Sequence, residues 1–163
     1  MPSAGARGTF PWAPEIPGPA LGELPEWEGI LQITRRMEFS ASFRLWRADW
    51  DEARNREVFG PQAGRKEYGH NYSLEVTLRG EVDAQTGMVM DLKELRDLLE
   101  REVGQRFDHR NLNEDTPYFQ NRAPTAENLA RVVFDLLDEA LPARLLKSVR
   151  LAPTEDLWVE VQR

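Results

Sequence analysis

Apolar residues alternate with polar ones in two segments of the N-terminal half. In residues 31–45 and 68–82 the apolar positions are Ile33, Met37, Phe39, Ala41, Phe43 and Leu45, then Tyr72, Leu74, Val76 and Leu78. A period of two is typical of a strand that buries one face against a core. We therefore expect two strands at these ranges. The charged segment 48–59 between them suits a short helix or a long loop.

Two later segments carry apolar residues at helical spacing. In the first, Asp91 is a good N-cap with Glu94 three positions later, and Gly104 is a typical stop. The second covers about 125–140 and is followed by Pro142. The apolar positions are Leu92, Leu95, Leu99 and Val103 in the first, and Leu129, Val132, Val133, Leu136, Leu137 and Ala140 in the second.

Two short strands, at 145–151 and 157–161 with a turn at 153–156, complete the chain. The order β-β-α-α-β-β predicts an α+β fold, with an antiparallel sheet and two helices on one face. Such a sheet leaves open edges, which proteins usually pair, cover or charge. Sheets from several copies can close a barrel together, so we expect a homo-oligomer.

Residues 1–30 differ from the domain at 31–163. They hold six of the eleven prolines and five of the eleven glycines, which disfavour regular structure. They also contain large apolar residues, namely Phe10, Trp12, Ile16, Leu21, Leu24 and Trp27. Two interpretations stay open: an extended arm that lies on the domain or on a neighbouring subunit, and a disordered tail.

Composition excludes several classes of function. The chain has no Cys, which removes disulfides, thiolate nucleophiles and zinc–sulfur sites. Its formal net charge of −7 argues against nucleic acid as a partner, because phosphate binding needs concentrated Lys and Arg. No apolar run approaches the roughly 20 residues of a membrane helix, and no secretory signal is recognisable. We therefore expect a soluble cytoplasmic protein.

Five short motifs occur in a fixed order over roughly residues 35–162. They are FSASFRL at 39–45, YGHNY at 68–72, GEVD with TGMVMD at 80–91, FDHRNL at 107–112 and PTAEN at 124–128. Together they resemble the 6-pyruvoyltetrahydropterin synthase family. The resemblance implies a T-fold subunit, trimers that close a twelve-stranded barrel, and often a hexamer of two trimers with active sites at subunit interfaces.

The resemblance also implies a chemistry. Family members convert dihydroneopterin triphosphate into 6-pyruvoyltetrahydropterin, and bacterial relatives make 6-carboxytetrahydropterin. Three His ligands hold zinc, a Cys acts as base, an Asp-His pair relays protons, and a Glu near the last strands binds the pterin edge. If active, this chain would therefore be a carbon–oxygen lyase that eliminates triphosphate.

Several of these positions are occupied differently here. Phe43 and Tyr68 stand where two zinc ligands are implied, and only His70 remains of the three. Because a catalytic zinc normally needs three protein ligands, we expect no family-type zinc site and no other cofactor. Gln62 stands at the Cys position, and an amide cannot act as a base.

At other positions the chain has the residues that the family resemblance implies. Asp108 and His109 match the Asp-His pair and are the candidate catalytic residues, although adjacent residues rarely pair their side chains. Thr125 and Glu127 match positions near the pterin pocket, but they also suit an ordinary helix start. Glu155 takes the place of the pterin-binding Glu if the turn has a two-residue gap.

Three functional hypotheses follow. Because three functional positions are lost together, we favour a pseudoenzyme or a protein that binds a pterin-like or purine-like ligand. The alternatives are an active 6-pyruvoyl- or 6-carboxytetrahydropterin synthase with an unusual site, and a metal-free dihydropterin aldolase that uses His109 with Glu67 or Glu155. All three predict self-association as a trimer or hexamer, without nucleic acid or membrane partners.

Overall fold

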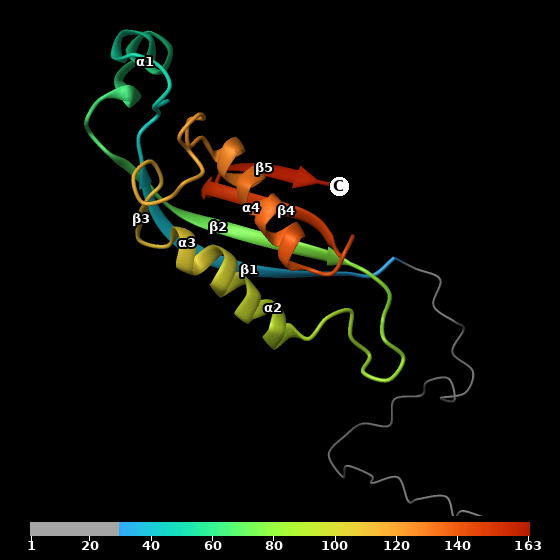
Figure 1. Cartoon of the computed structure of the whole chain (residues 1–163). Coiled ribbons are helices and arrows are strands. Elements are labelled where there is room, and N and C mark those ends of the chain that lie inside the picture. The colour runs from blue at the N-terminus through green and yellow to red at the C-terminus, as the bar shows by residue number, and fades with distance from the viewer. Residues whose placement is uncertain (1–29) are drawn as a thin grey trace, which may run out of the picture.

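The computed structural model describes residues 30–163, which form one five-stranded sheet with helices on one face (Figure 1). The strand order is β3-β1-β2-β4-β5, with antiparallel pairs except for β3, which runs parallel to β1. The strands are β1 (Gln32–Phe43), β2 (Tyr68–Arg79), β3 (Arg110–Asn111), β4 (Leu146–Thr154) and β5 (Leu157–Gln162). The expected α+β architecture is confirmed. Strands β1 and β2 lie where alternation predicts them, and β4 and β5 lie close to the predicted C-terminal strands.

Register explains why one face of the sheet is buried. Phe39 pairs with Tyr72, and Met37 pairs with Leu74, so apolar side chains from both strands point to the same side. The opposite face carries polar pairs, such as Ser40 with Asn71. The core residues of the sheet are Phe39, Ala41, Phe43, Tyr72, Leu74, Val76, Leu78, Leu146, Val149 and Leu151.

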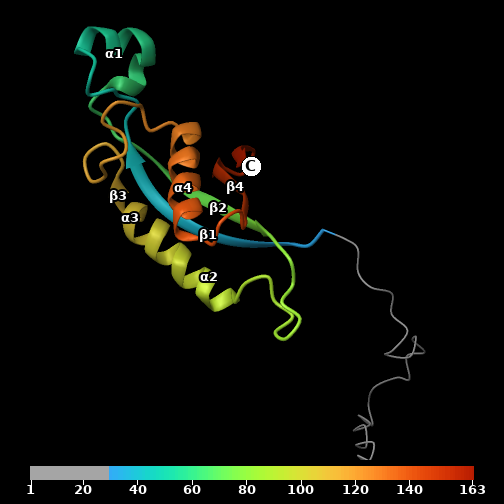
Figure 2. The same ribbon diagram turned by 45° about the vertical axis from the view of Figure 1, so that its right-hand side comes forward.

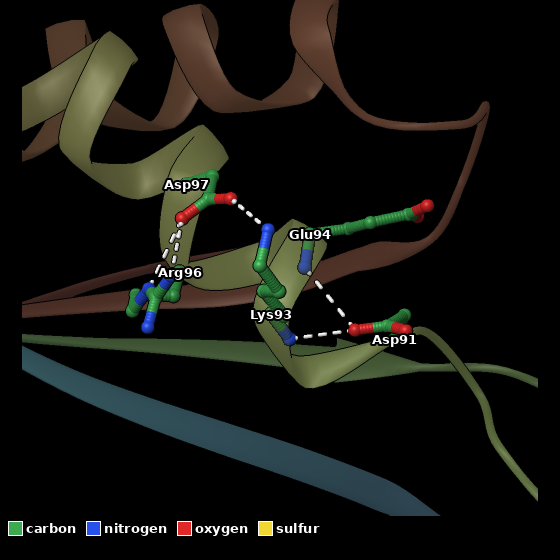
Figure 3. A network of polar contacts seen from close by, with 5 residues as sticks. All are labelled: Asp91, Lys93, Glu94, Arg96 and Asp97. Carbon is green, nitrogen blue, oxygen red and sulfur yellow. Dashed lines mark hydrogen bonds and ion pairs between the residues drawn. The ribbon is translucent and has the colours of Figure 1, made fainter.

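Helix α2 (Leu92–Leu99) begins at the predicted cap. The Asp91 carboxylate accepts hydrogen bonds from the backbone N–H groups of Lys93 at 2.7 Å and Glu94 at 3.3 Å (Figure 3). Lys93 Nζ reaches the carboxylate of Asp97, four residues later, at 3.1 Å. Such exposed pairs each stabilise a helix by only about 0.2–0.5 kcal/mol. The cap therefore fixes where the helix starts, and the buried leucines hold it on the sheet.

The predicted stop at Gly104 is wrong. Helical backbone continues through a π-helical segment (η2, Glu100–Gly104) into the short helix α3 (Gln105–Phe107). Phe107 is fully buried, and its ring lies 6.1 Å from that of Phe39. Burial of a phenyl ring contributes about 1.5–3 kcal/mol, which exceeds the roughly 1 kcal/mol that glycine costs in a helix. The extra turn also brings Asp108 to the edge of β1.

Helix α4 (Ala126–Ala140) packs against β4 and β5, and Figure 2 shows it beside β4. Its N-cap is Thr125, whose hydroxyl accepts a hydrogen bond from the N–H of Asn128 at 3.2 Å. Leu129, Val133 and Leu137 are fully buried, as their helical spacing predicts. The helix ends at Ala140, before Pro142.

The charged segment after β1 contains helix α1 (Glu52–Phe59) and the 3-10 turn η1 (Gly60–Ala63). Asn55 is completely buried there. Its side chain accepts a hydrogen bond from Arg47 N at 2.7 Å and donates to the carbonyl oxygens of Arg47 and Asp51 at 2.9 and 3.0 Å. One amide side chain therefore ties the loop to the first turn of α1.

Replacing Asn55 with Ala is expected to lower the free energy of unfolding by about 2–3 kcal/mol, because several backbone groups lose their partner. Denaturant unfolding followed by circular dichroism measures this. Asn121→Ala, at an exposed position, is the matched control and should change stability by no more than about 0.5 kcal/mol. Equal effects of the two substitutions would contradict a special role for Asn55.

Two edges of the sheet are only partly paired among the described residues. Strand β5 pairs with β4 alone, and β1 is covered by β3 only at Ala41 and Ser42. None of the helices in the described part of the chain has the length and apolar character that a membrane crossing requires. The alternatives for residues 1–29, an ordered arm or a disordered tail, lie outside the described residues.

Candidate functional site

Asp108 and His109 are in direct contact at the end of α3. Asp108 Oδ2 lies 3.0 Å from His109 Nδ1, and Asp108 Oδ1 accepts a hydrogen bond from Ser40 N at 2.8 Å. The expectation that adjacent side chains do not pair is therefore wrong here. The carboxylate fixes one ring nitrogen of His109, which leaves Nε2 as the nitrogen open to a ligand.

The backbone at His109 explains the unusual pairing of neighbours. His109 has φ of 58°, a left-handed conformation that few residues other than glycine adopt. Its N–H donates to Ser40 O at 2.7 Å, and the parallel pairing of β3 with β1 begins at the next residue. The sheet edge thus holds the reversed backbone that turns the imidazole toward Asp108.

The pKa of Asp108 is held below its usual range, first by the hydrogen bond from Ser40 N and further by His109. A lowered pKa means that the folded state favours the ionised carboxylate. The contribution to stability is present above the ordinary carboxyl pKa and is lost as pH falls through the lowered value. At neutral pH the side chain of Asp108 is therefore an ionised carboxylate.

The side chain of His109 is largely exposed, with 83% of its surface accessible, and the residue lines a shallow groove of about 540 Å³. The groove runs over the ends of β1, β2 and β3. Asn111 organises its rim, because its Nδ2 donates to Glu67 Oε1 at 3.0 Å and its N–H donates to Asp115 Oδ2 at 2.8 Å. The lining residues include Ser40, Ser42, His70, Asn71, His109 and Asp115.

The positions of the implied zinc ligands come together on the buried side of this sheet end. Phe43 pairs directly with Tyr68, and His70 follows two residues later on the same face. The ring of Phe43 lies 5.4 Å from that of His70, stacked, and 6.4 Å from that of Tyr68. Tyr72 meets His70 edge-on at 5.5 Å. The three positions are thus neighbours, but their contacts with one another are aromatic.

A second groove, of about 680 Å³, adjoins the first through Gly69, His70 and Asn71. Glu155 lies in the β4–β5 turn at its rim, together with Trp158. Strand β4 extends to Thr154, so the turn is shorter than predicted and Pro153 is a buried strand residue. Glu155 is therefore the carboxylate of this turn that shares a groove with His70.

Thr125 and Glu127 are at the start of α4 and line neither groove. Thr125 caps the helix, and Glu127 is the acidic residue of its first turn, where a negative charge is favoured. The structure thus accounts for both by helix-start chemistry, and their role in ligand binding stays a prediction. Gln62 lies in η1, where its carbonyl accepts from Leu45 N at 3.0 Å.

Comparison with known proteins identifies the family to which the chain belongs. The family model described as 6-pyruvoyl tetrahydropterin synthase matches residues 32–163. The chain belongs to the 6-pyruvoyl tetrahydropterin synthase family. A Poecilia reticulata protein named 6-pyruvoyl tetrahydrobiopterin synthase is 41% identical, with 80% of this chain and 89% of the relative covered. The Homo sapiens protein of that name is 39% identical, with 77% and 86% covered.

A solved structure agrees. The Caenorhabditis elegans 6-pyruvoyl tetrahydropterin synthase superposes with a TM-score of 0.76 at 33% identity, covering 83% of this chain and 96% of that one. The T-fold subunit expected from the motifs is therefore confirmed. Closure of a barrel by several subunits stays a prediction.

The favoured interpretation of a pseudoenzyme is contradicted by these relatives. They are named synthases, and their 39–41% identity extends over more than three quarters of this chain. The three substituted positions are few beside the residues that match. Asp108 and His109 are both present in the sequence, and their side chains are in contact in the structure. The alternative of an active synthase agrees better with the findings.

Zinc is the metal that the family resemblance implies, and the residues at this position do not fit it. Phe43 offers no donor atom, and Tyr68 would have to ionise to bind a metal. Among residues 30–163 no group of three or more His, Asp or Glu side chains is placed to hold a metal ion. No step of the chemistry is therefore assigned to zinc.

Sequence reasoning missed the residues that position the site. Ser40 holds Asp108 through its backbone N–H, and Asn111 holds Glu67 and Asp115. The donor in the first contact is a backbone N–H, which the identity of the side chain at position 40 does not report. Asn111 carried a weak signal, because it lies in the FDHRNL motif beside the Asp-His pair.

Proposed function

We propose that the protein is an active synthase of the 6-pyruvoyl tetrahydropterin type, which eliminates triphosphate from dihydroneopterin triphosphate. The observation that carries this proposal is the Asp108–His109 contact at 3.0 Å, with the imidazole open to a groove. An oriented imidazole that can accept a proton is the group such an elimination requires. The names of the similar proteins support the same reaction.

The proposed step balances with groups of this chain. His109 Nε2 takes a proton from a side-chain carbon of the substrate, and the electron pair of that C–H bond forms a C=C bond. The C–O bond to the triphosphate breaks, and its electron pair leaves with the triphosphate. Asp108 keeps Nδ1 protonated and stabilises the imidazolium that forms, as carboxylates beside a base do.

We propose that this chemistry proceeds without the three-His zinc, because two of the three positions lack a neutral nitrogen donor. The pterin ring is proposed to enter the second groove. Glu155 can accept there from the amide and amino groups of a pterin, a pairing that carboxylates make well. His70 lines both the groove proposed for the ring and the groove that contains His109.

Self-association is proposed for the same fold. The outer part of β1 and the free side of β5 expose strand edges among the described residues, and pairing them between copies would satisfy their backbone groups. A trimer or a hexamer of two trimers is the expected assembly. Both grooves are open toward solvent in one chain, so a neighbouring copy could complete their walls.

The test is incubation of the purified protein with dihydroneopterin triphosphate, with and without a chelator, followed by chromatography of the pterins. We expect 6-pyruvoyltetrahydropterin and released triphosphate under both conditions. An active relative, which is expected to be chelator-sensitive, serves as the positive control. A 6-carboxy or 6-hydroxymethyl pterin would replace the proposed reaction, and the absence of product would overturn it. Loss of product only with chelator would overturn the metal-free part.

A further inference from the structure

A groove of about 990 Å³ lies at the opposite end of β1 and β2 from the Asp108–His109 pair. Four basic side chains and one acidic side chain line it, although the whole protein carries a net charge of −7. Apolar residues complete the wall. The lining residues are Ile30, Leu31, Arg79, Gly80, Glu81, Val82, Arg144, Leu146, Lys147 and Arg163. We call this feature the basic groove.

Most of the positive charge in the basic groove is not neutralised within the described residues. Arg163 pairs with Asp138. Among residues 30–163, no ion pair involves Arg79, Arg144 or Lys147, and the Lys147 ammonium donates to Arg163 O at 2.8 Å. Concentrated, uncompensated cations in an acidic protein attract a negatively charged partner.

A segment that precedes the groove residues Ile30 and Leu31 in the sequence has the opposite charge. Residues 23–29 read ELPEWEG and contain three glutamates with no basic residue. Leu24 and Trp27, which lie among these acids in the sequence, are apolar, as are Ile30, Leu31, Val82 and Leu146 in the wall of the groove. The segment leads directly into Ile30 and Leu31, which themselves line the basic groove.

We propose that residues 23–29 bind along the basic groove of the same chain, with the glutamates facing Arg79, Arg144 and Lys147. An extended segment of seven residues reaches up to about 23–25 Å, so tethering at Ile30 keeps it near the groove. A short tether corresponds to about millimolar effective concentration, so weak ion pairs are enough for binding. This inference does not depend on the proposed catalytic function.

Thiol cross-linking in the 163-residue chain tests the proposal, because this chain has no Cys that would compete with the two introduced. Pro25→Cys is combined with Val82→Cys, an exposed groove residue, so that every charge is kept. A short bis-maleimide linker is expected to join the two within one chain at least several-fold faster than it joins Pro25→Cys to Leu92→Cys. Leu92 is similarly exposed but lies outside the groove.

Charge exchange supplies the second arm of the experiment. Arg79→Glu with Arg144→Glu should reduce the cross-linking rate several-fold, as should Glu23→Lys with Glu28→Lys. Combining the four changes should restore it, because the charges are complementary again. All four positions are charged and solvent-facing or outside the described domain, so folding is expected to persist, which circular dichroism verifies.

Three outcomes would overturn the proposal. Equal rates with Val82→Cys and Leu92→Cys would show no preference for the groove. Cross-links found only between chains on a denaturing gel would assign the groove to the segment of a second copy. Rates unaffected by charge reversal, but lowered by added inorganic triphosphate, would indicate that the groove binds a small anion instead.

Discussion

Replacing His109 with Asn is expected to lower kcat/KM for triphosphate elimination by about 100- to 10,000-fold, the range that a general base contributes. Asn is the appropriate substitution because it tolerates the positive φ of 58° at this position better than Ala does. The side chain of His109 is mostly exposed, so the change should alter the unfolding free energy little. The measurement is steady-state formation of the pterin product with the purified variant.

The role of the pair is separated from a structural role by two further readouts. An imidazole base is inactive once protonated, so the wild-type rate should fall toward acidic pH, and the residual activity of the variant should lack that acidic limb. Asp108→Asn should also lower kcat while preserving some pH dependence, because it removes the partner that orients the ring. Glu114→Gln, an exposed neighbour in the same loop, is the matched control.

Activity of the His109→Asn variant within a few-fold of wild type would contradict the assignment of His109 as the base. Glu67 would then be the next group to replace. Its carboxylate accepts a hydrogen bond at 3.0 Å from the side chain of Asn111, which lines the same groove.

Changing Phe43 and Tyr68 together to His is expected to create a zinc site, which we propose the wild type lacks. Positions 43 and 68 are directly opposite each other on adjacent strands, and His70 is on the same face. The existing rings lie 5.4–6.4 Å from the ring of Phe43, which is the spacing at which three imidazoles can converge on one ion with bonds of about 2.0–2.1 Å. The zinc content measured by elemental analysis should rise from near zero in the wild type to about one zinc per chain in the double variant.

Added zinc should also raise the melting temperature of the double variant, because a ligand that binds only the folded state stabilises it. Phe43→His with Tyr68→Phe is the matched control, since it has only two imidazoles and should bind zinc weakly. Stoichiometric zinc in the wild-type protein would contradict the metal-free proposal. A double variant that folds but binds no zinc would contradict the geometry inferred from the strand register.

The zinc positions also show how sequence can mislead about activity. Phe43, Tyr68 and Gln62 stand where the family resemblance implies two zinc ligands and a Cys, and these replacements favoured a pseudoenzyme. The similarity to proteins named synthases nevertheless extends over most of the chain. Counting the replaced side chains ignores the functional groups that are still present and that the fold holds in position. The carboxylate–imidazole pair beside Ser40 is such a group.

The sequence by itself determined the α+β fold and its four long strands. Alternation located β1 and β2 because a half-buried strand needs an apolar residue at every second position. Asp91 and Thr125 marked both helix starts because the unpaired N–H groups of a first turn need an acceptor. The ordered motifs identified the family, and they singled out Asp108 and His109.

Only the tertiary structure decided how these parts meet. Burial of Phe107 carries the helix past Gly104, and this places Asp108 where Ser40 N can bind it. The two-residue strand β3 is too short to give a periodic signal and exists because β1 offers an edge to pair with. The pairing of Asp108 with His109 depends on that edge, since it holds His109 at a φ that the local sequence does not favour.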